Sequence, residues 1–211
     1  VKRKASGAYG NAGQSCIAVQ RIYVHKELHQ SFLDEFVAAS VATRVGDPAD
    51  EATVVGPMID ESSAKKVEEW IAEAVRGGAR ILCGGKRRGA VLDPTVLVDV
   101  KPDMKVSCQE VFAPVVTIEP FDSFEQAVEM VNSSDYGLQA GVFTNDFSHV
   151  LHAYKTLEVG GVIINDYPTF RIDHMPYGGV KDSGFGREGV KYAIEEMMEP
   201  KLLVVNPQFA S

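Results

Sequence analysis

The chain has 211 residues, of which 45% are hydrophobic and 24% charged, values that are ordinary for a globular domain. Its formal net charge of −8 and its pI of about 5.1 disfavour a nucleic-acid partner, because an acidic surface repels phosphate groups. No stretch of about 18 apolar residues occurs, so the sequence predicts no membrane span.

The three cysteines, Cys16, Cys83 and Cys108, are odd in number and lack CxxC spacing. This pattern argues against a disulfide framework and a structural zinc site, and it favours a reducing compartment such as the cytoplasm. No histidine pair comes with an acidic ligand, so we expect no metal site. The chain begins with Val1 rather than Met and shows no signal peptide, so we expect it to be a piece of a longer protein.

The first half of the chain alternates strand and helix patterns. A strand rich in β-branched and aromatic residues is predicted over 19–24, and apolar residues at helical spacing predict a helix over 26–44. Asp60 marks the start of a second helix, because acidic residues stabilise a helix N-terminus, and Gly77 ends it. Further strands are predicted over 79–83, 94–100 and 114–120.

The second half continues this alternation. Helices are predicted over 123–132, 146–157 and 186–198, and strands over 138–144, 160–165 and 201–205. Such alternation is typical of βαβ units, so the expected fold class is α/β, a three-layer α/β/α domain with a mostly parallel twisted sheet. No linker divides the chain, so residues 1–211 are interpreted as one domain. Its last strand, within 200–206, is expected to lie apart from the main sheet.

Cys16 is a candidate nucleophile because of its immediate neighbours. It stands among small and amide-bearing residues, just before the apolar run Ile17–Val19. Where a turn enters a helix, unpaired backbone N–H groups and the helix dipole favour the thiolate, which is the nucleophilic form. By residue type alone, however, a small buried hydrophobe is the commoner role of a single cysteine.

Several separated motifs, the first of which contains this cysteine, change the interpretation. They are Gly13-Gln14-Ser15-Cys16, Val45-Gly46-Asp47-Pro48, Pro94-Thr95-Val96-Leu97, Gln109-Glu110-Val111-Phe112-Ala113-Pro114, Gly141-Val142-Phe143-Thr144 and Pro176-Tyr177-Gly178-Gly179. With these motifs in this order, the chain resembles the C-terminal catalytic domain of the NAD(P)-dependent aldehyde dehydrogenase superfamily. The resemblance covers about the whole chain.

The resemblance implies that Cys16 is the catalytic nucleophile. Its thiolate would attack an aldehyde carbon to give a thiohemiacetal, hydride would pass to the nicotinamide, and water would release the acid from the resulting thioester. A covalent adduct suits this reaction, because it fixes the reacting carbon beside the cofactor. The Cys16 backbone N–H is a natural donor to the oxyanion, since it moves with the nucleophile.

The resemblance also implies cofactor contacts at Glu110 and Phe112. The carboxylate would accept hydrogen bonds from the nicotinamide ribose, and the ring would limit the movement of that ribose. Spacing alone favours an exposed Glu and a core Phe. The chain has Gln109 and Ala113 where the family more often has Glu and Gly, and neither change removes the two contact residues. Tyr177 stands where the family usually has Phe; we interpret it as part of a structural glycine turn, with a functional role as the alternative.

The first half of the family's proteins supplies the dinucleotide-binding domain, the general-base glutamate and an oxyanion-hole asparagine, and these have no counterpart in this sequence. We therefore expect NAD or NADP to be bound mainly by an absent domain, and little or no turnover by the chain alone. The run Gly184–Gly189 matches GxGxxG by letter but follows no strand, so we do not assign it to dinucleotide binding. A CoA-acylating aldehyde dehydrogenase, a non-catalytic structural fragment and a thiol esterase remain alternatives.

The substrate is expected to be a small aldehyde, and the resemblance places loop 167–174 along its entry tunnel. Phe170 and Arg171 are therefore candidate substrate contacts. A guanidinium binds a carboxylate or phosphate through paired hydrogen bonds, which suggests a small anionic or hydroxylated aldehyde. The alternative is that Arg171 pairs with Asp173 or another surface acid. The resemblance also implies a homo-oligomer, in which residues 201–205 are a candidate edge strand.

Overall fold

The core of the molecule is a four-stranded sheet in the computed structural model, which describes residues 7–207. The strand order is β1 (Arg21–His25), β6 (Val115–Phe121), β5 (Thr95–Val98) and β2 (Arg80–Cys83). The pairs β1–β6 and β6–β5 are parallel, and β2 is an antiparallel edge strand. The mostly parallel sheet predicted from the sequence is therefore confirmed.

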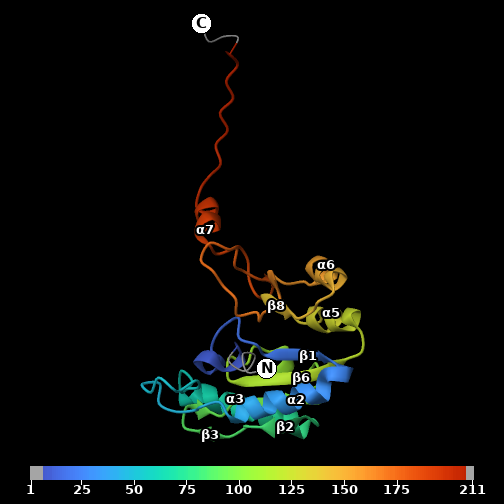
Figure 1. Ribbon diagram of the computed structural model, residues 1–211. Helices are drawn as coiled ribbons and strands as arrows, with labels where there is room; N and C mark the ends of the chain where they lie inside the picture. The colour runs from blue at the N-terminus through green and yellow to red at the C-terminus, as the bar shows by residue number, and fades with distance from the viewer. Residues whose placement is uncertain (1–6, 208–211) are drawn as a thin grey trace.

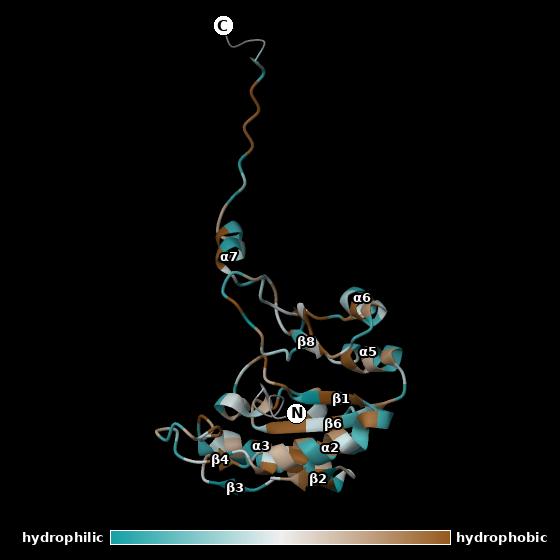
Figure 2. Cartoon of the chain, viewed as in Figure 1, coloured by the Kyte–Doolittle hydropathy of each residue, from teal (hydrophilic) through white to brown (hydrophobic). Residues whose placement is uncertain are grey.

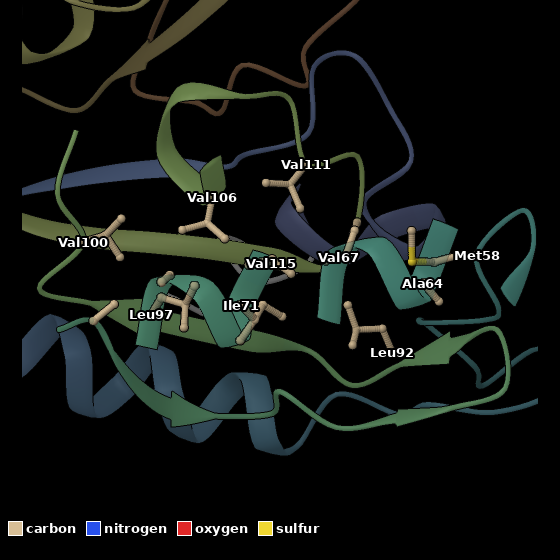
Figure 3. Close-up of a cluster of buried hydrophobic side chains, with 13 residues drawn as sticks. Met58, Ala64, Val67, Ile71, Leu92, Leu97, Val100, Val106, Val111 and Val115 are labelled. Atoms are coloured by element: carbon tan, nitrogen blue, oxygen red, sulfur yellow. The ribbon is translucent and has the colours of Figure 1, made fainter. Parts of the chain in front are cut away.

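Two long helices cover opposite faces of this sheet, α2 (Lys26–Val41) and α3 (Glu61–Arg76). On the α2 side, Phe36 belongs to one buried cluster with Val116 and Ile118 of β6. The second cluster joins α3 to the other face of the sheet (Figure 3), and the labelled members are Met58, Ala64, Val67, Ile71, Leu92, Leu97, Val100, Val106, Val111 and Val115. The order helix, sheet, helix is the predicted three-layer α/β/α arrangement.

Helix α3 begins and ends where its residues predict. The Asp60 carboxylate accepts a hydrogen bond from the Ser63 N–H at 2.6 Å, and this bond holds the pKa of Asp60 below its usual value. Val67 and Ile71 lie one helical turn apart on the buried face. Burying a side chain such as that of Ile71, which is 2% exposed, contributes roughly 1.5–3 kcal/mol to folding. Gly77 caps the C-terminus.

A parallel pair, β8 (Gln139–Val142) and β9 (Gly161–Ile164), is separate from the four-stranded sheet. Helix α6 (Phe147–Thr156) connects the two strands and contacts α5 (Phe124–Asn132); Figure 1 shows these elements above the main sheet. We expected a single main sheet with a buried strand over 160–165, whereas β9 is only half-buried. Both short strands contain glycine, which leaves few side chains to pack and keeps this pair small.

The C-terminal part differs most from the prediction. Helix α7 spans only Val190–Glu196, because Gly189 precedes it at φ +109°, a left-handed conformation that does not extend a helix. Residues 201–205 form no strand within the described chain and run outward as an exposed, largely hydrophobic segment (Figures 1 and 2). A strand needs a neighbour that bonds its backbone, and residues 7–207 place none beside this segment. Its role between subunits stays a prediction.

Several short elements that the sequence did not predict complete the description. They are the turn η1 (Gly10–Gly13), the hairpin strands β3 (Arg87–Arg88) and β4 (Val91–Leu92), the helix α4 (Lys105–Cys108) and the antiparallel strands β7 (Tyr136–Gly137) and β10 (Val180–Lys181). Arg87 of β3 pairs with Glu61 and Glu68 of α3, each at 2.9 Å. These ion pairs tie the hairpin to the helix.

Candidate active site

Cys16 lies in a turn that connects η1 to β1, and its side chain is exposed. The turn is closed by a hydrogen bond that the Ala18 N–H donates to the Ser15 carbonyl at 3.0 Å. Residues 14–20 run from this turn directly into β1, where the sequence predicted a strand, so no helix begins at Cys16. The surroundings of the thiol are therefore set by neighbouring loops rather than by a helix dipole.

Gly13 allows the Cys16 turn to lie against a second segment, residues 109–114. It has φ +70°, and a Cβ added there would lie 2.1 Å from the Ala113 carbonyl oxygen. The left-handed conformation and the close approach both require glycine. This contact brings the thiol to the predicted cofactor residues.

Cys16, Glu110 and Phe112 line one small hollow of about 40 Å³. The rest of its wall comes from the same two segments and the residues around β1 and β6: Gly13, Ser15, Ala18, Val19, Gln20, Ala113 and Val115. The structure therefore brings Cys16 together with Glu110 and Phe112, two residues that the sequence singled out and that lie far from Cys16 in the chain. The sulfur atom is exposed at this hollow and is not enclosed in the apolar core.

Phe112 has a backbone conformation that is unusual for its residue type. Its φ is +52°, in the left-handed region, where a residue other than glycine carries strain of order 1–3 kcal/mol. Such strain is concentrated at functional sites. Phe112 is 43% exposed, so it is not the core Phe that spacing alone favours, and Glu110 is exposed beside it. An exposed carboxylate next to an exposed ring fits a nicotinamide ribose.

Gln20 fixes the segment that carries Glu110, and sequence reasoning missed it. Its Nε2 donates to the carbonyl oxygens of Val106 at 3.2 Å and Gln109 at 2.8 Å. Its Oε1 accepts a hydrogen bond from the Val111 N–H at 3.0 Å. One amide just before β1 thus holds the loop on both sides of Glu110. No local pattern in the sequence marks this contact.

Tyr177 is the side-chain partner of the thiol, since its hydroxyl lies 2.7 Å from the Cys16 sulfur. Burial is the main cause that raises the pKa of Tyr177, and the hydrogen bond to Cys16 raises this pKa further. Tyr177 is only 6% exposed. We interpreted it from sequence as structural, so the contact with the thiol supports the alternative.

Arg171 lies over the Tyr177 ring, with its guanidinium carbon 4.4 Å from the ring centroid. Its Nη2 donates to Glu188 Oε2 at 2.8 Å, so the surface acid that pairs with it is Glu188 and not Asp173. The side chains of this ion pair are 45% and 66% exposed. An exposed pair of this kind contributes little stability, which leaves the guanidinium open to exchange with another anion.

Phe170 lies on the same loop as Arg171. It is 44% exposed and does not line the hollow that Cys16 shares with the cofactor residues. Its carbonyl oxygen accepts a hydrogen bond from Gln139 Nε2 at 3.2 Å, so β8 holds this loop. Its assignment to the substrate stays a prediction.

The glycine turn after Pro176 has the structural role that the sequence predicted. A Cβ added at Gly160 would lie 1.6 Å from the Gly178 carbonyl oxygen, so the two backbones touch there. Only glycine at 160 permits this approach. The contact fixes the turn, and with it Tyr177, next to the start of β9.

Over residues 7–207, no group of three or more His, Cys, Asp and Glu side chains is arranged to hold a metal ion. No helix of this described part is long and apolar enough to cross a bilayer.

Comparison with known proteins gives consistent matches. Residues 1–203 match the sequence profile of the aldehyde dehydrogenase family. The 3-sulfolactaldehyde dehydrogenase of Priestia aryabhattai is 52% identical over 199 residues, which are 94% of this chain and 42% of that protein. The chain thus spans about two fifths of the length of such a relative.

Solved structures agree with this match. Aldehyde dehydrogenase 21 from Physcomitrella patens, in complex with the reaction product succinate, is 46% identical with a TM-score of 0.95, over 97% of this chain and 42% of that one. The glyceraldehyde-3-phosphate dehydrogenase GapN from Methanocaldococcus jannaschii, complexed with NADP, is 44% identical with a TM-score of 0.89, over 92% and 42%. Since the profile match covers nearly all of the sequence and the fold agrees, the chain belongs to the aldehyde dehydrogenase family.

Proposed function

We propose that this chain carries the nucleophilic thiol of an aldehyde dehydrogenase that oxidises an aldehyde to a carboxylic acid. One observation carries the proposal: Cys16 opens onto the same hollow as Glu110 and Phe112. A nucleophile must be reachable, and Cys16 is exposed whereas Cys83 and Cys108 are partly buried. Family membership supports the reaction type.

The proposed reaction begins when the Cys16 thiolate attacks the aldehyde carbon and a thiohemiacetal forms. The Cys16 backbone N–H donates to the oxygen that becomes negative, because it moves together with the sulfur. When bound beside the thiol, the nicotinamide supplies the hydride acceptor, so that a thioester remains on Cys16. Water then attacks the thioester carbon, the acid is released, and the sulfur leaves as thiolate.

The covalent intermediate provides the test of this assignment. The complete protein is mixed with aldehyde and NAD or NADP, quenched with acid and digested with trypsin, which releases Cys16 within peptide 5–21. We expect this peptide to gain the mass of the acyl group. Turnover with no acyl group on the Cys16 peptide, under conditions where the thioester survives, would contradict the proposal.

The nicotinamide cofactor fits the residues that face the thiol. The exposed Glu110 carboxylate accepts hydrogen bonds from the ribose hydroxyls, and the Phe112 ring limits the movement of the ribose. The NADP bound to the GapN relative supports a nicotinamide dinucleotide. We propose that most of its contacts come from the part of the longer protein that this chain does not span.

The substrate class is proposed to be a small anionic aldehyde. The three relatives described above are named for sulfolactaldehyde or glyceraldehyde 3-phosphate, or bind succinate, and each of these molecules carries a sulfonate, phosphate or carboxylate. Arg171 is the candidate that receives this group, because its ion pair with Glu188 is exposed and exchangeable. Its position on the Tyr177 ring places it near the thiol.

Replacing Arg171 with Leu in the complete protein tests this substrate assignment. We expect KM to rise about tenfold or more for an anionic aldehyde, as one charge-assisted hydrogen bond is lost, and to change little for a neutral aldehyde of equal length. Equal effects on both aldehydes would dismiss the role of Arg171 and leave the thiol chemistry unaffected.

We further propose that the chain is the C-terminal catalytic part of a cytoplasmic homo-oligomer and has little activity alone. The chain spans 42% of the length of its 3-sulfolactaldehyde dehydrogenase relative, which supports the proposal that another part of the protein binds the cofactor. NAD(P)H formation by the purified 211-residue chain tests this: we expect almost none. Turnover comparable to that of the complete protein would refute it.

A further inference from the structure

Tyr177 is held in place independently of the thiol that it contacts. Its N–H donates to the Glu188 carbonyl at 3.1 Å, and the Glu188 N–H donates to the Tyr177 carbonyl at 2.6 Å, which forms an isolated antiparallel bridge. The Arg171 guanidinium lies on the ring and is itself paired with Glu188. The hydroxyl therefore stands at a fixed position, and the Cys16 turn brings the sulfur to it.

The direction of the hydrogen bond follows from the groups around it. Arg171 and Glu188 face the pair from the Tyr177 side, and Glu110 stands on the wall of the hollow that Cys16 lines. Burial, above all, keeps the pKa of Tyr177 above its usual value of 10.0, so the phenol stays protonated where a thiol ionises. Once Cys16 has lost its proton, Tyr177 must be the donor and the sulfur the acceptor.

We propose that Tyr177 is a positioning residue whose hydroxyl donates to the Cys16 thiolate, and that this bond both stabilises the thiolate and restrains its attack. The inference rests on the nucleophilic role proposed above for Cys16. A hydrogen bond to an anion favours the charged form, and it also lowers the nucleophilicity of the sulfur, because a more stable thiolate attacks more slowly. Tyr177 thus sets how much thiolate is present and how reactive it is.

Replacing Tyr177 with Phe removes only the hydroxyl and separates these two effects. Loss of a charge-assisted hydrogen bond is expected to raise the pH at which Cys16 alkylation reaches half its maximal rate by about one unit. The maximal rate at high pH is expected to rise about threefold, because nucleophilicity changes with a Brønsted slope of about 0.4–0.5. A merely structural role for the ring predicts neither shift.

The experiment measures iodoacetamide labelling of the complete protein between pH 5 and 10. Trypsin separates the three thiols into peptides 5–21, 81–86 and 106–155, so mass spectrometry gives a rate for each. Tyr154→Phe is the matched control, because Tyr154 is 74% exposed on α6. Circular dichroism verifies that the variants fold. We expect Tyr177→Phe to fold, because the family usually carries Phe at this position. As a second variant, 3-fluorotyrosine at position 177, a stronger donor, is expected to lower the pH midpoint.

Two failures remain distinguishable in this experiment. If Cys16 in the unaltered chain reacts no faster than Cys83 and Cys108, the proposed function itself is contradicted. If Cys16 is the fastest thiol but Tyr177→Phe and fluorotyrosine leave its midpoint and maximal rate unchanged, only the role of Tyr177 is overturned. Opposite shifts of the midpoint in the two variants, with Tyr154→Phe unchanged, support the inference.

Discussion

Single residues at the site differ in how well the sequence predicts them. Cys16, Glu110 and Phe112 stand in motifs, and the structure places all three on one hollow. Gln20 acts through contacts with residues that are remote in the chain, so no local pattern identifies it. Tyr177 stands in the Pro176–Gly179 motif, but its contact with the Cys16 sulfur does not follow from that motif. The chain turns at Cys16 and then enters β1, so no helix dipole acts on the thiol.

The close contact between Gly13 and the Ala113 carbonyl group can be tested by substitution. Gly13→Ala puts a Cβ 2.1 Å from the Ala113 carbonyl oxygen at φ +70°, so we expect the free energy of unfolding to fall by more than about 1 kcal/mol. Urea denaturation measures this change. Gly10→Ala is the control, because nothing lies within 4 Å of a Cβ at Gly10. Similar stability of the two variants would contradict the proposed contact.

Secondary-structure elements were predicted where local signals decide them. Helix α3 begins at the capping carboxylate of Asp60 and ends at Gly77, as the sequence predicts. Helix α7 is shorter than predicted, because apolar spacing does not reveal that Gly189 is left-handed. Residues 201–205 have the composition of a strand, but a strand also needs a partner, and composition does not supply one.

Gln20 links β1 to the loop that carries Glu110. Gln20→Ala leaves the Val111 N–H and two carbonyl oxygens without this partner, so we expect a loss of about 1–3 kcal/mol in the free energy of unfolding. We also expect weaker NAD(P) binding by the complete protein, measured by calorimetry. Gln30→Ala on α2 removes an exposed amide and should change stability by less than about 0.5 kcal/mol. Equal effects of the two variants would show that Gln20 does not hold the loop that carries Glu110.

Glu119 of β6 gives a pH-dependent prediction. Burial raises its pKa above 4.5. Its carboxylate accepts a hydrogen bond from the Val100 N–H at 2.8 Å, which offsets only part of this rise. The folded state thus holds the proton more tightly than the unfolded state, and this stabilisation, complete below the unfolded pKa, is lost as pH rises through the folded pKa. Glu119→Gln keeps the acceptor without the charge, so it should be the more stable form at pH 7.

Urea midpoints between pH 4 and 8 check this expectation. The stability advantage of Glu119→Gln should shrink as the pH falls toward 4, where the carboxyl of the unaltered chain is protonated. Glu69→Gln, at an exposed position of α3, is the matched control and should show no such trend. An advantage that is independent of pH would show that burial of the charge is not its cause.

On the scale of the whole molecule, the chain exposes apolar surface that a larger assembly would cover. Leu202, Leu203, Val204 and Val205 form a continuous run of exposed apolar residues. Exposed apolar patches of this kind mark interaction surfaces, and the chain spans only 42% of its 3-sulfolactaldehyde dehydrogenase relative. This exposed run fits the further subunits proposed above, whose arrangement no pattern within this chain specifies.

The segment 201–205 is expected to pair with another subunit in the complete protein. Leu203→Glu places a charge in this pairing and weakens it. We therefore expect the oligomer to dissociate already at a higher protein concentration, as measured by size exclusion with light scattering. Ile59→Glu alters another exposed apolar residue, 82% exposed, and should leave the oligomer intact. An unchanged oligomer in the Leu203→Glu variant would show that the segment does not join subunits.

The thiol of Cys16 is central to the whole account, and turnover by the complete protein tests it most directly. Cys16→Ala removes the sulfur that we propose forms the thiohemiacetal, so aldehyde oxidation should fall by roughly a thousandfold or more, while cofactor binding is retained. Cys108→Ala serves as the control and should keep its activity. If Cys16→Ala oxidises aldehydes within about tenfold of the unaltered protein, the assigned nucleophile is wrong.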